Sequence, residues 1–324
     1  MVTIKDIAKQ AGVSVSTTSR ALNDNPRISQ ETRERVKKIA AELGYQPNYT
    51  ARNLTRGESN MVGLIFPVTE DTAPANPFHI DLMRGVSTAL QPLHYEMVVA
   101  IAATQDELLE EVRSMVDQSK VHNFLVFYAM SNDPITAYLR QNNLNFVIIG
   151  HPMDQYPDRF VDNDNIAAGK AATEQLLKTH HLTHPAFLES VDPWLFERER
   201  AAGYDECMRT HHLKAVVWQL GTNADSLDDF LNNHPETDGL LFSDDLLFVR
   251  FSHELQKRSL PVFCFNNSRL MGMLTNSDGR VDLRPRELGR EAVKLLFDPM
   301  KHHSYVTFQV NYESTLVKIK EKLG

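Results

Sequence analysis

From Met61 onward, short apolar segments alternate with segments of helical spacing, and this alternation constrains the fold more than any other feature. Eight segments have the length and composition of β-strands: 61–67, 95–101, 123–128, 145–149, 185–189, 214–219, 238–242 and 261–265. The helical segments are 79–91, 105–117, 133–140, 165–179, 196–210, 224–232, 245–257 and 285–297. Apolar strands bounded by helices predict parallel sheets covered on both faces. The strands fall into two groups on either side of residues 161–165, which predicts two α/β lobes with a cleft between them.

Residues 3–23 predict a different structure, two short helices joined by a tight turn. Thr3 and Ser14 are N-cap candidates, and Gly12 can adopt the left-handed backbone of the turn. One face of the second helix is apolar or small and includes Thr18. The other face carries Val15, Ser16, Ser19, Arg20 and Asn23. This is the sequence form of a helix-turn-helix, whose second helix can enter the major groove of DNA.

A third helix over residues 30–43 has Ser29 as its N-cap candidate and completes a small helical head. Its apolar residue Val36 can close a core with Ile7, Val13 and Leu22. Residues 1–60 carry ten basic and six acidic groups, a net +4, so the remainder of a chain of net charge −8 carries −12. A basic head on an acidic body suits a head that meets phosphates.

The composition indicates in which cellular environment the chain works. It holds no stretch of 18 or more apolar residues, so we expect no membrane span. Its charged N-terminus does not have the pattern of a signal peptide. Cys207 and Cys264 do not form a disulfide framework, and we expect two inert buried thiols in a cytoplasmic protein.

Residues 47–60 are predicted to link a head of residues 1–46 to a body of residues 61–324. A helix this short is marginal in isolation, so the residues alone favour a flexible tether. Leu54, however, lies between Arg52 and Arg56, a composition typical of a wedge that opens a base step in the minor groove.

Polar and aromatic residues follow several predicted strands of the body. They are Asn76, Phe78 and His79 after the first strand, Trp194 and Arg200 after the fifth, Asp244 after the seventh and Asn266 after the eighth. Carboxylates, amides and an arginine can form paired hydrogen bonds with neighbouring hydroxyls, and an aromatic face can pack on a sugar ring. Each residue alone also suits a structural role, such as a helix start for Asp244 or a turn for Asn266.

The sequence favours neither catalysis nor a bound cofactor. No glycine-rich phosphate loop follows a strand, and no nucleophile-and-base arrangement stands out. The histidines at 180, 181, 184, 302 and 303 have loose spacing for metal ligands, so we expect no metal and no cofactor other than a small-molecule sugar effector.

The motifs TIKDIAKQAGVSVSTTSRALN, ISQETRERVKKIAAELGYQPN and ARNL resemble those of the lactose/galactose repressor family of bacterial transcription regulators. In the body, NPFHIDLMRGV, VDNDNIAAG, ERERAAGY, LFSDD and CFNNS resemble segments of that family's effector domain. The NPF, VDNDN and FNNS forms look most like its maltose-operon repressors. The resemblance implies a small all-α helix-turn-helix head plus an α/β two-lobed, periplasmic-binding-protein-like effector domain with parallel sheets.

The resemblance also implies a homodimer on double-stranded operator DNA. Val15, Ser16 and Arg20 would read bases, Arg20 by paired hydrogen bonds to guanine. Thr17, Ser19, Asn23 and Tyr45 would hold phosphates or fix the register. Leu54 of each hinge helix would enter the minor groove, which reverses the preference for a tether. The remaining implied DNA-binding residues are Thr3, Ser14, Asn48 and Ala51.

In the body, the resemblance implies a sugar bound between the lobes. Arg200 and Asn266 match positions that hold sugar hydroxyls in relatives, and Asp244 lies beside another. Thr18 departs from the usual valine, which we expect to weaken packing slightly, and Arg250 stands where a small residue is usual. Three alternatives stay open: a regulator with a phosphorylated carrier-protein corepressor, a sugar-binding receptor, and an enzyme that uses Asp244 and Asp245 as acids.

Overall fold

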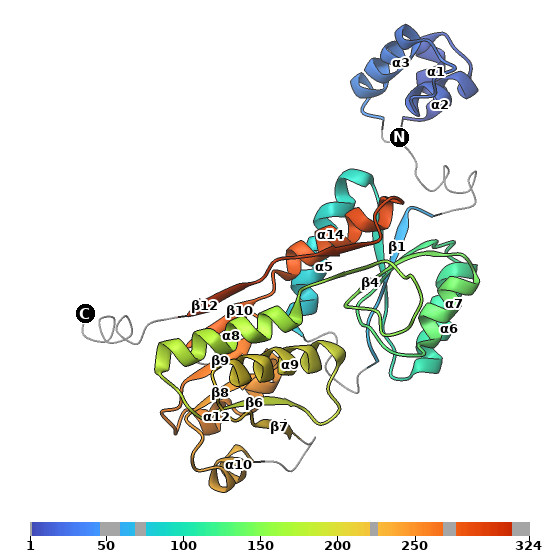
Figure 1. Ribbon diagram of the computed structural model, residues 1–324. Coiled ribbons are helices and arrows are strands. Elements are labelled where there is room, and N and C mark those ends of the chain that lie inside the picture. Colours follow the sequence, from blue (N-terminus) through green and yellow to red (C-terminus); the bar gives the residue numbers. More distant parts are fainter. Residues whose placement is uncertain (1, 46–58, 69–75, 221–225, 268–276, 313–324) are drawn as a thin grey trace, which may run out of the picture. The chain divides into compact units, whose positions relative to one another are not determined.

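The computed structural model describes residues 2–45, 59–68, 76–220, 226–267 and 277–312. The chain divides into two compact units, Met1–Ser59 and Asn60–Gly324. Figure 1 shows both units. The predicted hinge at 47–60 lies almost entirely outside the described residues, and Asn48, Ala51 and Leu54 lie outside them.

The first unit is the predicted three-helix head. Its helices are α1 (Ile4–Ala11), α2 (Val15–Leu22) and α3 (Gln30–Glu42). Gly12 has a φ of 66° at the turn after α1, in the left-handed region that glycine adopts without strain. The buried core consists of Ile7, Ala11, Ala21, Val36 and Ala40, and the predicted Val13 and Leu22 pack against it while partly exposed. Small alanines at these positions let three short helices approach closely.

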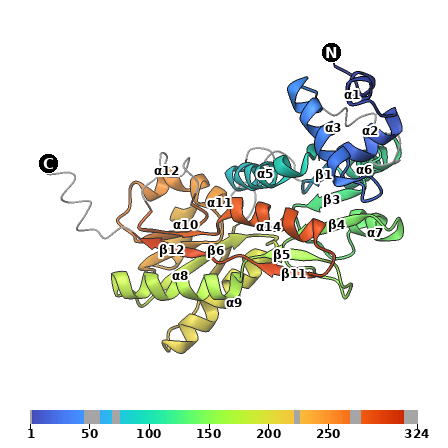
Figure 2. The ribbon, with the colours of Figure 1, turned by 90° about the horizontal axis from the view of Figure 1, so that it is seen from above.

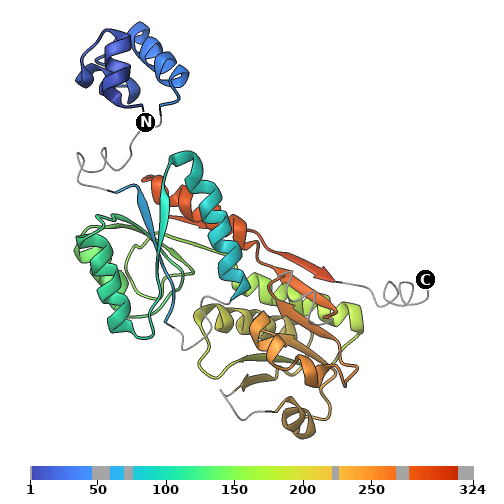
Figure 3. The ribbon, with the colours of Figure 1, turned by 180° about the vertical axis from the view of Figure 1, so that it is seen from behind.

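The second unit holds two six-stranded sheets, each between two layers of helices (Figures 1 and 3). The first sheet has the order β11-β5-β4-β3-β1-β2, and all its strand pairs are parallel. Its strands are β1 (Met61–Ile65), β2 (Glu96–Ala100), β3 (Asn123–Val126), β4 (Asn145–Ile149), β5 (Phe160–Asp162) and β11 (His303–Tyr305). Helices α5 (Pro77–Leu90) and α14 (Pro285–Phe297) cover one face, and α6 (Gln105–Asp117) and α7 (Pro134–Gln141) cover the other.

The second sheet has the order β12-β10-β9-β8-β6-β7. Its strands are β6 (Pro185–Ser190), β7 (Val217–Leu220), β8 (Gly239–Phe242), β9 (Val262–Phe265), β10 (Gly279–Asp282) and β12 (Gln309–Tyr312). Helices α8 (Asn165–His180) and α9 (Leu195–Thr210) cover one face, and α10 (Leu227–Asn233), α11 (Asp245–Arg250) and α12 (Ser252–Leu255) lie on the other. Only the edge strand β12 is antiparallel to its neighbour among the pairs in the described residues.

The division of the chain between the lobes differs from the predicted one. The helix at 285–297 was correctly placed in the sequence, but α14 packs on α5 in the first lobe (Figure 2), and β11 also joins the first sheet. The chain therefore passes between the lobes three times, not once at residues 161–165. The four strands that the sequence did not predict, β5, β10, β11 and β12, are three or four residues long and lack a continuous apolar run. The predicted helix 245–257 is divided into α11 and α12.

One amide side chain connects the three segments of the chain that pass between the lobes. The Asn163 Nδ2 donates to the carbonyl oxygens of Leu283 at 3.1 Å and of Val306 at 2.8 Å, and Asn163 is buried. The backbone N–H of Val306 donates to Asp162 at 2.8 Å. The segments that connect the lobes are thus hydrogen-bonded to one another, because buried carbonyls need partners.

Two glycines allow α8 and α9 to touch backbone to backbone. A Cβ on Gly203 would lie 2.0 Å from the carbonyl oxygen of Ile166, and one on Gly169 would lie 2.2 Å from that of Arg200. Because the obstructing atoms are backbone atoms of the neighbouring helix, no side-chain rotation can make room.

We therefore predict that Gly203→Ala lowers the free energy of unfolding of the second unit by at least about 1–3 kcal/mol, the usual cost of overpacking. The measurement is the urea midpoint followed by circular dichroism. Ala202→Ser, on the exposed face of α9, is the matched control and should change the midpoint little. Equal losses in the two variants would contradict the close contact.

Candidate functional site

Helix α2 presents a polar surface that is fixed at its N-terminus. The Ser14 hydroxyl caps the helix by accepting from the Thr17 N–H at 3.1 Å, and it lies 2.9 Å from the hydroxyls of both Ser16 and Thr17. At the other end, the Asn23 side chain donates to the carbonyl of Ser19 at 2.7 Å. The short helix is therefore capped at both ends by its own polar residues.

The outer face of α2 carries the predicted base-reading residues. Val15 is 43% exposed, although it is apolar, and Ser16 and Arg20 are exposed. Within the part of the chain that is described, the Arg20 guanidinium forms no ion pair or side-chain hydrogen bond. An exposed valine on the same helix face as an arginine that no described residue of the head engages is a surface suited to base edges.

The remaining head residues have mainly structural contacts. Thr18 is fully buried, as predicted, and its hydroxyl donates to the carbonyl of Ser14 at 3.0 Å, which satisfies the polar group that a valine would lack. Thr3 caps α1, and its hydroxyl and N–H donate to Asp6 at 2.7 and 2.8 Å. Tyr45 packs partly against the core of the head.

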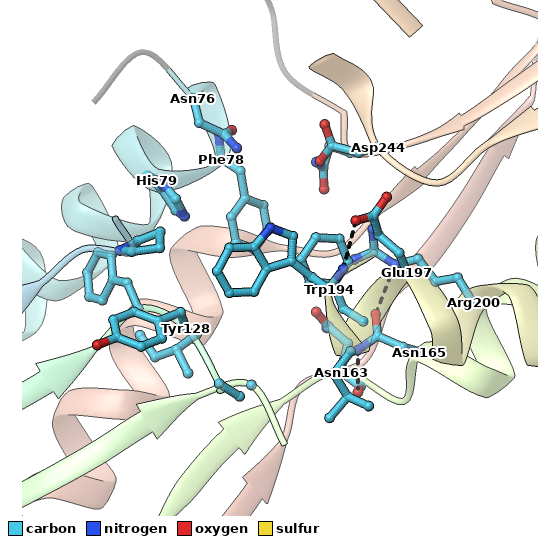
Figure 4. A pocket seen from close by; sticks show the side chains of 18 of the residues that line it. Asn76, Phe78, His79, Tyr128, Asn163, Asn165, Trp194, Glu197, Arg200 and Asp244 are labelled. Carbon is cyan, nitrogen blue, oxygen red and sulfur yellow. Dashed lines mark hydrogen bonds between the residues drawn. The ribbon is translucent and has the colours of Figure 1, made fainter. Parts of the chain in front are cut away.

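Between the two lobes lies a cavity of about 400 Å³. Its lining residues come from the carboxyl ends of strands in both sheets, where ligands of open α/β sheets bind. All seven predicted effector residues line it: Asn76, Phe78, His79, Trp194, Arg200, Asp244 and Asn266. Figure 4 shows the first six of these. The sequence did not single out other lining residues, notably Tyr128, His151, Asp162, Asn163, Asn165, Ser190, Glu197, Leu246 and Leu247. Three of these belong to the VDNDN motif, which in the sequence indicated a lobe boundary and a family resemblance but no pocket residue.

Arg200 is the buried cation of the pocket. Its Nε donates to Asn165 Oδ1 at 3.0 Å, and its Nη1 donates to the carbonyl of Ser243 at 2.6 Å. The guanidinium also lies 4.5 Å from the ring centroids of both Phe196 and Phe265. Burial lowers the pKa of Arg200 to about 10, against the effect of nearby carboxylates, so it stays charged at neutral pH.

Asp244 and Asn266 form a second polar group, at the ends of β8 and β9. Asp244 caps α11 by accepting from the Leu246 N–H at 2.7 Å, so it has the structural role of a helix start that its sequence position also suited. The Asn266 Nδ2 donates to Asp244 at 3.2 Å and to Asp245 at 3.0 Å. The Oδ1 atom of Asn266 is buried and accepts no hydrogen bond from any described residue. A ligand hydroxyl could donate to that oxygen, and leaving such an acceptor unsatisfied costs about 1–3 kcal/mol.

Trp194 lies in the middle of the pocket, between the Phe78 and His79 side and the Arg200 and Asp244 side (Figure 4). Its backbone N–H donates to Glu197 at 3.0 Å, and the same buried carboxylate accepts from the hydroxyls of Ser190 at 3.0 Å and Ser243 at 2.7 Å. Glu197 thereby fixes the start of α9, so the indole is held on a rigid element rather than on a loose loop.

On the first lobe, aromatic rings form the apolar side of the pocket. The His79 ring lies 5.3 Å from that of Phe66 in an edge-on arrangement, and Phe66 lies 4.9 Å from Phe127. The pocket thus joins aromatic surface from one lobe with a charged hydrogen-bonding group from the other, which is the usual construction of a small-ligand site.

Burial perturbs the ionisation of two carboxyl groups in the pocket, and neighbouring acids add to the effect. Burial raises the pKa of Asp162 to about 7, with Glu199 adding to the rise and Arg200 opposing it. Burial also raises the pKa of Asp244, and its neighbour Asp245 raises it further. The folded state consequently holds protons that an unfolded aspartate has already lost.

This difference predicts a pH effect on stability. Between about pH 4 and 7 the native Asp162 binds more protons than the unfolded one, so stability falls as pH rises through that range. Asp162→Asn removes this titration. The unfolding free energy of the variant minus that of the unchanged chain should therefore be about 2–3 kcal/mol larger at pH 8 than at pH 5. Urea unfolding at the two pH values measures it. Asp192→Asn, whose side chain is 97% exposed, should show no such gain, and an equal gain in both variants would refute the assignment.

None of the helices in the described residues is long and apolar enough to cross a membrane. Comparison with known proteins gives two matches to family models. Residues 3–48 match bacterial regulatory proteins of the lacI family. Residues 59–246, more than half of the chain, match periplasmic binding proteins and the sugar binding domain of the lacI family.

Individual relatives agree with these matches. The chain is 29% identical over 305 residues to the HTH-type transcriptional regulator MalR of Streptococcus pneumoniae, covering 91% of this chain and 92% of MalR. Among solved structures, a complex of the transcriptional regulator CelR with cellobiose has a TM-score of 0.70 at 22% identity, covering 97% of this chain and 100% of that one. The lac repressor dimer bound to operator has a TM-score of 0.72 at 18% identity, covering 97% and 99%.

These relatives are regulators rather than enzymes, in agreement with the expectation from the sequence. The helix-turn-helix head, the two-lobed body and the two family matches lead to one conclusion: the chain belongs to the lacI family of bacterial regulatory proteins.

Proposed function

We propose that this protein represses a sugar-utilisation operon, that it binds operator DNA as a homodimer through α2, and that maltose or a malto-oligosaccharide in the interlobe pocket controls its affinity for DNA. The observation that carries the proposal is the pocket itself. It combines Arg200, Asp244 and Asn266 with the Trp194 indole in about 400 Å³, within the range of small-ligand sites.

The chemistry of the pocket favours a neutral polyhydroxylated ligand. Hydroxyl groups can donate to the carboxylate of Asp244 and to Oδ1 of Asn266, and they can accept from Arg200. The C–H face of a pyranose can pack on Trp194. The lining carries the carboxyl groups of Asp162, Glu197 and Asp244 against the two arginines Arg200 and Arg250, so an anionic ligand would gain little net attraction.

The relatives support the disaccharide class. A solved structure with a TM-score of 0.72 at 19% identity is that of a probable maltose operon transcriptional repressor, malR, and the CelR structure holds cellobiose, a disaccharide of glucose. In this chain the pocket is lined by several aromatic residues, more than a single small polyol would require. These features support our proposal that the ligand is a glucose disaccharide or a longer glucoside.

The effector would act through the passages between the lobes. Asp162, Asn163 and Asn165 lie both in a connecting segment and in the pocket lining. A ligand that contacts both lobes binds one lobe arrangement better than another, and it shifts the population by no more than that difference in affinity. Whichever arrangement it favours would alter the fit of the two heads of a dimer to the operator.

The contact of Arg20 with DNA gives the first prediction of this proposal. Arg20→Ala should cost about 1–3 kcal/mol in operator affinity and relax the preference at one base pair. Binding is measured by fluorescence anisotropy at fixed salt with operators varied one base pair at a time. Arg35→Ala, an exposed arginine on α3, removes the same charge and should leave base preference intact. A uniform loss across all operators in Arg20→Ala would show a phosphate contact instead.

Ligand binding can be followed with the two tryptophans of the chain. Trp194 lines the pocket, whereas Trp218 stacks on Phe230 at 4.3 Å in a separate core. The variant Trp218→Phe keeps Trp194 as the only tryptophan. Its fluorescence should change when maltose or maltotriose is added, and the change should saturate as the sugar concentration rises. In Trp194→Phe the remaining signal should stay constant.

Cellobiose and ribose are titrated in the same way for comparison. Each sugar that binds is then added to the operator-binding assay. Binding of maltose with no change in operator affinity would reject the regulatory role. A response of Trp218 alone would reject the pocket. The absence of binding by any malto-oligosaccharide would reject the effector class.

A further inference from the structure

A cluster of three potential metal ligands lies on the second lobe, outside the interlobe pocket. Glu174 on α8 faces Cys207 on α9 and His211, which caps the C-terminus of α9. The Glu174 Oε2 atom lies 2.6 Å from His211 Nε2 and 3.3 Å from Cys207 Sγ. All three ligand atoms lie within 4.8 Å of one another. None of the three residues lines the pocket.

The scaffold holds these side chains on rigid elements. Cys207 and His211 are four residues apart, so they lie one helical turn apart on the same face of α9. Glu174 approaches from α8, and the glycine contacts of Gly169 and Gly203 fix the separation of the two helices. Cys207 is buried, whereas the His211 side chain is 37% exposed, so one side of the cluster is open to ions from solvent.

The orientation of the Glu174 carboxylate points one oxygen into the cluster. Its Oε1 atom pairs with Lys178 at 2.8 Å, which leaves Oε2 directed at Cys207 and His211. The Lys178 ammonium and His211 hold the pKa of Glu174 down to about 2, so the carboxylate is ionised. Burial raises the pKa of Cys207 to about 12, so the sulfur carries a proton until a metal ion displaces it.

The donor set and its spacing match zinc. Thiolate, imidazole and carboxylate bind Zn²⁺ at about 2.0–2.3 Å, which in a tetrahedral site separates ligand atoms by roughly 3.3–3.7 Å. The distance of 3.3 Å between Glu174 Oε2 and Cys207 Sγ already lies in this range. The distance of 2.6 Å between Glu174 Oε2 and His211 Nε2 would increase by about 1 Å, which rotation of the side chains allows.

We propose that Glu174, Cys207 and His211 bind Zn²⁺, with water as the fourth ligand. Binding releases the Cys207 proton to solvent and forms the sulfur–metal bond, and the proton on His211 Nε2 moves to Nδ1 so that the Nε2 lone pair can bind the ion. The ion connects α8 to α9 at the end of the helix pair remote from the pocket. The site is independent of the proposed sugar and of DNA.

The test uses the untagged full-length protein and Co²⁺ as a spectroscopic substitute for Zn²⁺. One equivalent of Co²⁺ should produce the near-ultraviolet absorption of a thiolate–cobalt bond, and Zn²⁺ should abolish it. Cys207→Ser should lose the band. Cys264→Ala, which removes the other buried cysteine, should keep it. Circular dichroism establishes that each variant is folded.

Calorimetry with Zn²⁺ alone gives the second readout. Glu174→Gln and His211→Ala should each weaken binding at least about tenfold, the scale typical for perturbing a metal site. His212→Ala, an exposed neighbouring histidine, should bind as the unchanged chain does, and it serves as control if Cys264→Ala does not fold. No thiolate band in the unchanged chain, or a band that persists in Cys207→Ser, would show that the cluster is only a hydrogen-bonded contact between helices.

Discussion

The body of this protein depends on the hydrogen bonds that one buried amide forms at the junction of its lobes. The chain passes between the lobes at three places, and the Asn163 side chain donates to the carbonyls of Leu283 and Val306 in the other two. Because the amide is buried, both bonds form in an environment where an unpaired carbonyl would be costly. The same segment contributes Asp162, Asn163 and Asn165 to the pocket. A change in how a ligand contacts this segment is therefore also a change at the connection between the lobes.

Arg200 extends this connection into the second lobe. Its guanidinium donates to Asn165 in the connecting segment and to the carbonyl of Ser243 at the end of β8. The backbone carbonyl oxygen of Arg200 lies in close contact with Gly169 of α8. A buried arginine cannot become neutral, so the fold must supply acceptors and nearby carboxylates around it. The result is a site in which burial raises the pKa values of Asp162 and Asp244, and neighbouring acids raise them further. Stability, helix packing and ligand recognition thus depend on overlapping residues.

How much could be predicted from the sequence varied with the range of the interactions. The helices of the head followed from local capping and spacing, and Ser14, Gly12 and Thr18 have the positions expected of them. The seven pocket residues were found because they follow apolar strands, and parallel strands end at one edge of a sheet. Asn163 was missed because its partners Leu283 and Val306 are far along the chain, and Glu197 was missed because its role at the pocket includes the distant Ser243 as well as its near neighbours Ser190 and Trp194. The short strands β5, β10, β11 and β12 were missed because they carry no apolar run of their own and form only beside an existing sheet.

The sequence alone determined the helix-turn-helix, the alternation of strands and helices, and the polar residues at the strand ends, since each is set by neighbours a few residues apart. Only the tertiary structure decided which lobe each C-terminal element joins. Helix α14 has an amphipathic pattern that would fit either sheet, and it lies in the first lobe because glycines at 85 and 289 allow close contact with α5. The convergence of Glu174 with Cys207 and His211 was likewise decided by packing. Those residues come from two helices, and no spacing within either helix predicts their separation.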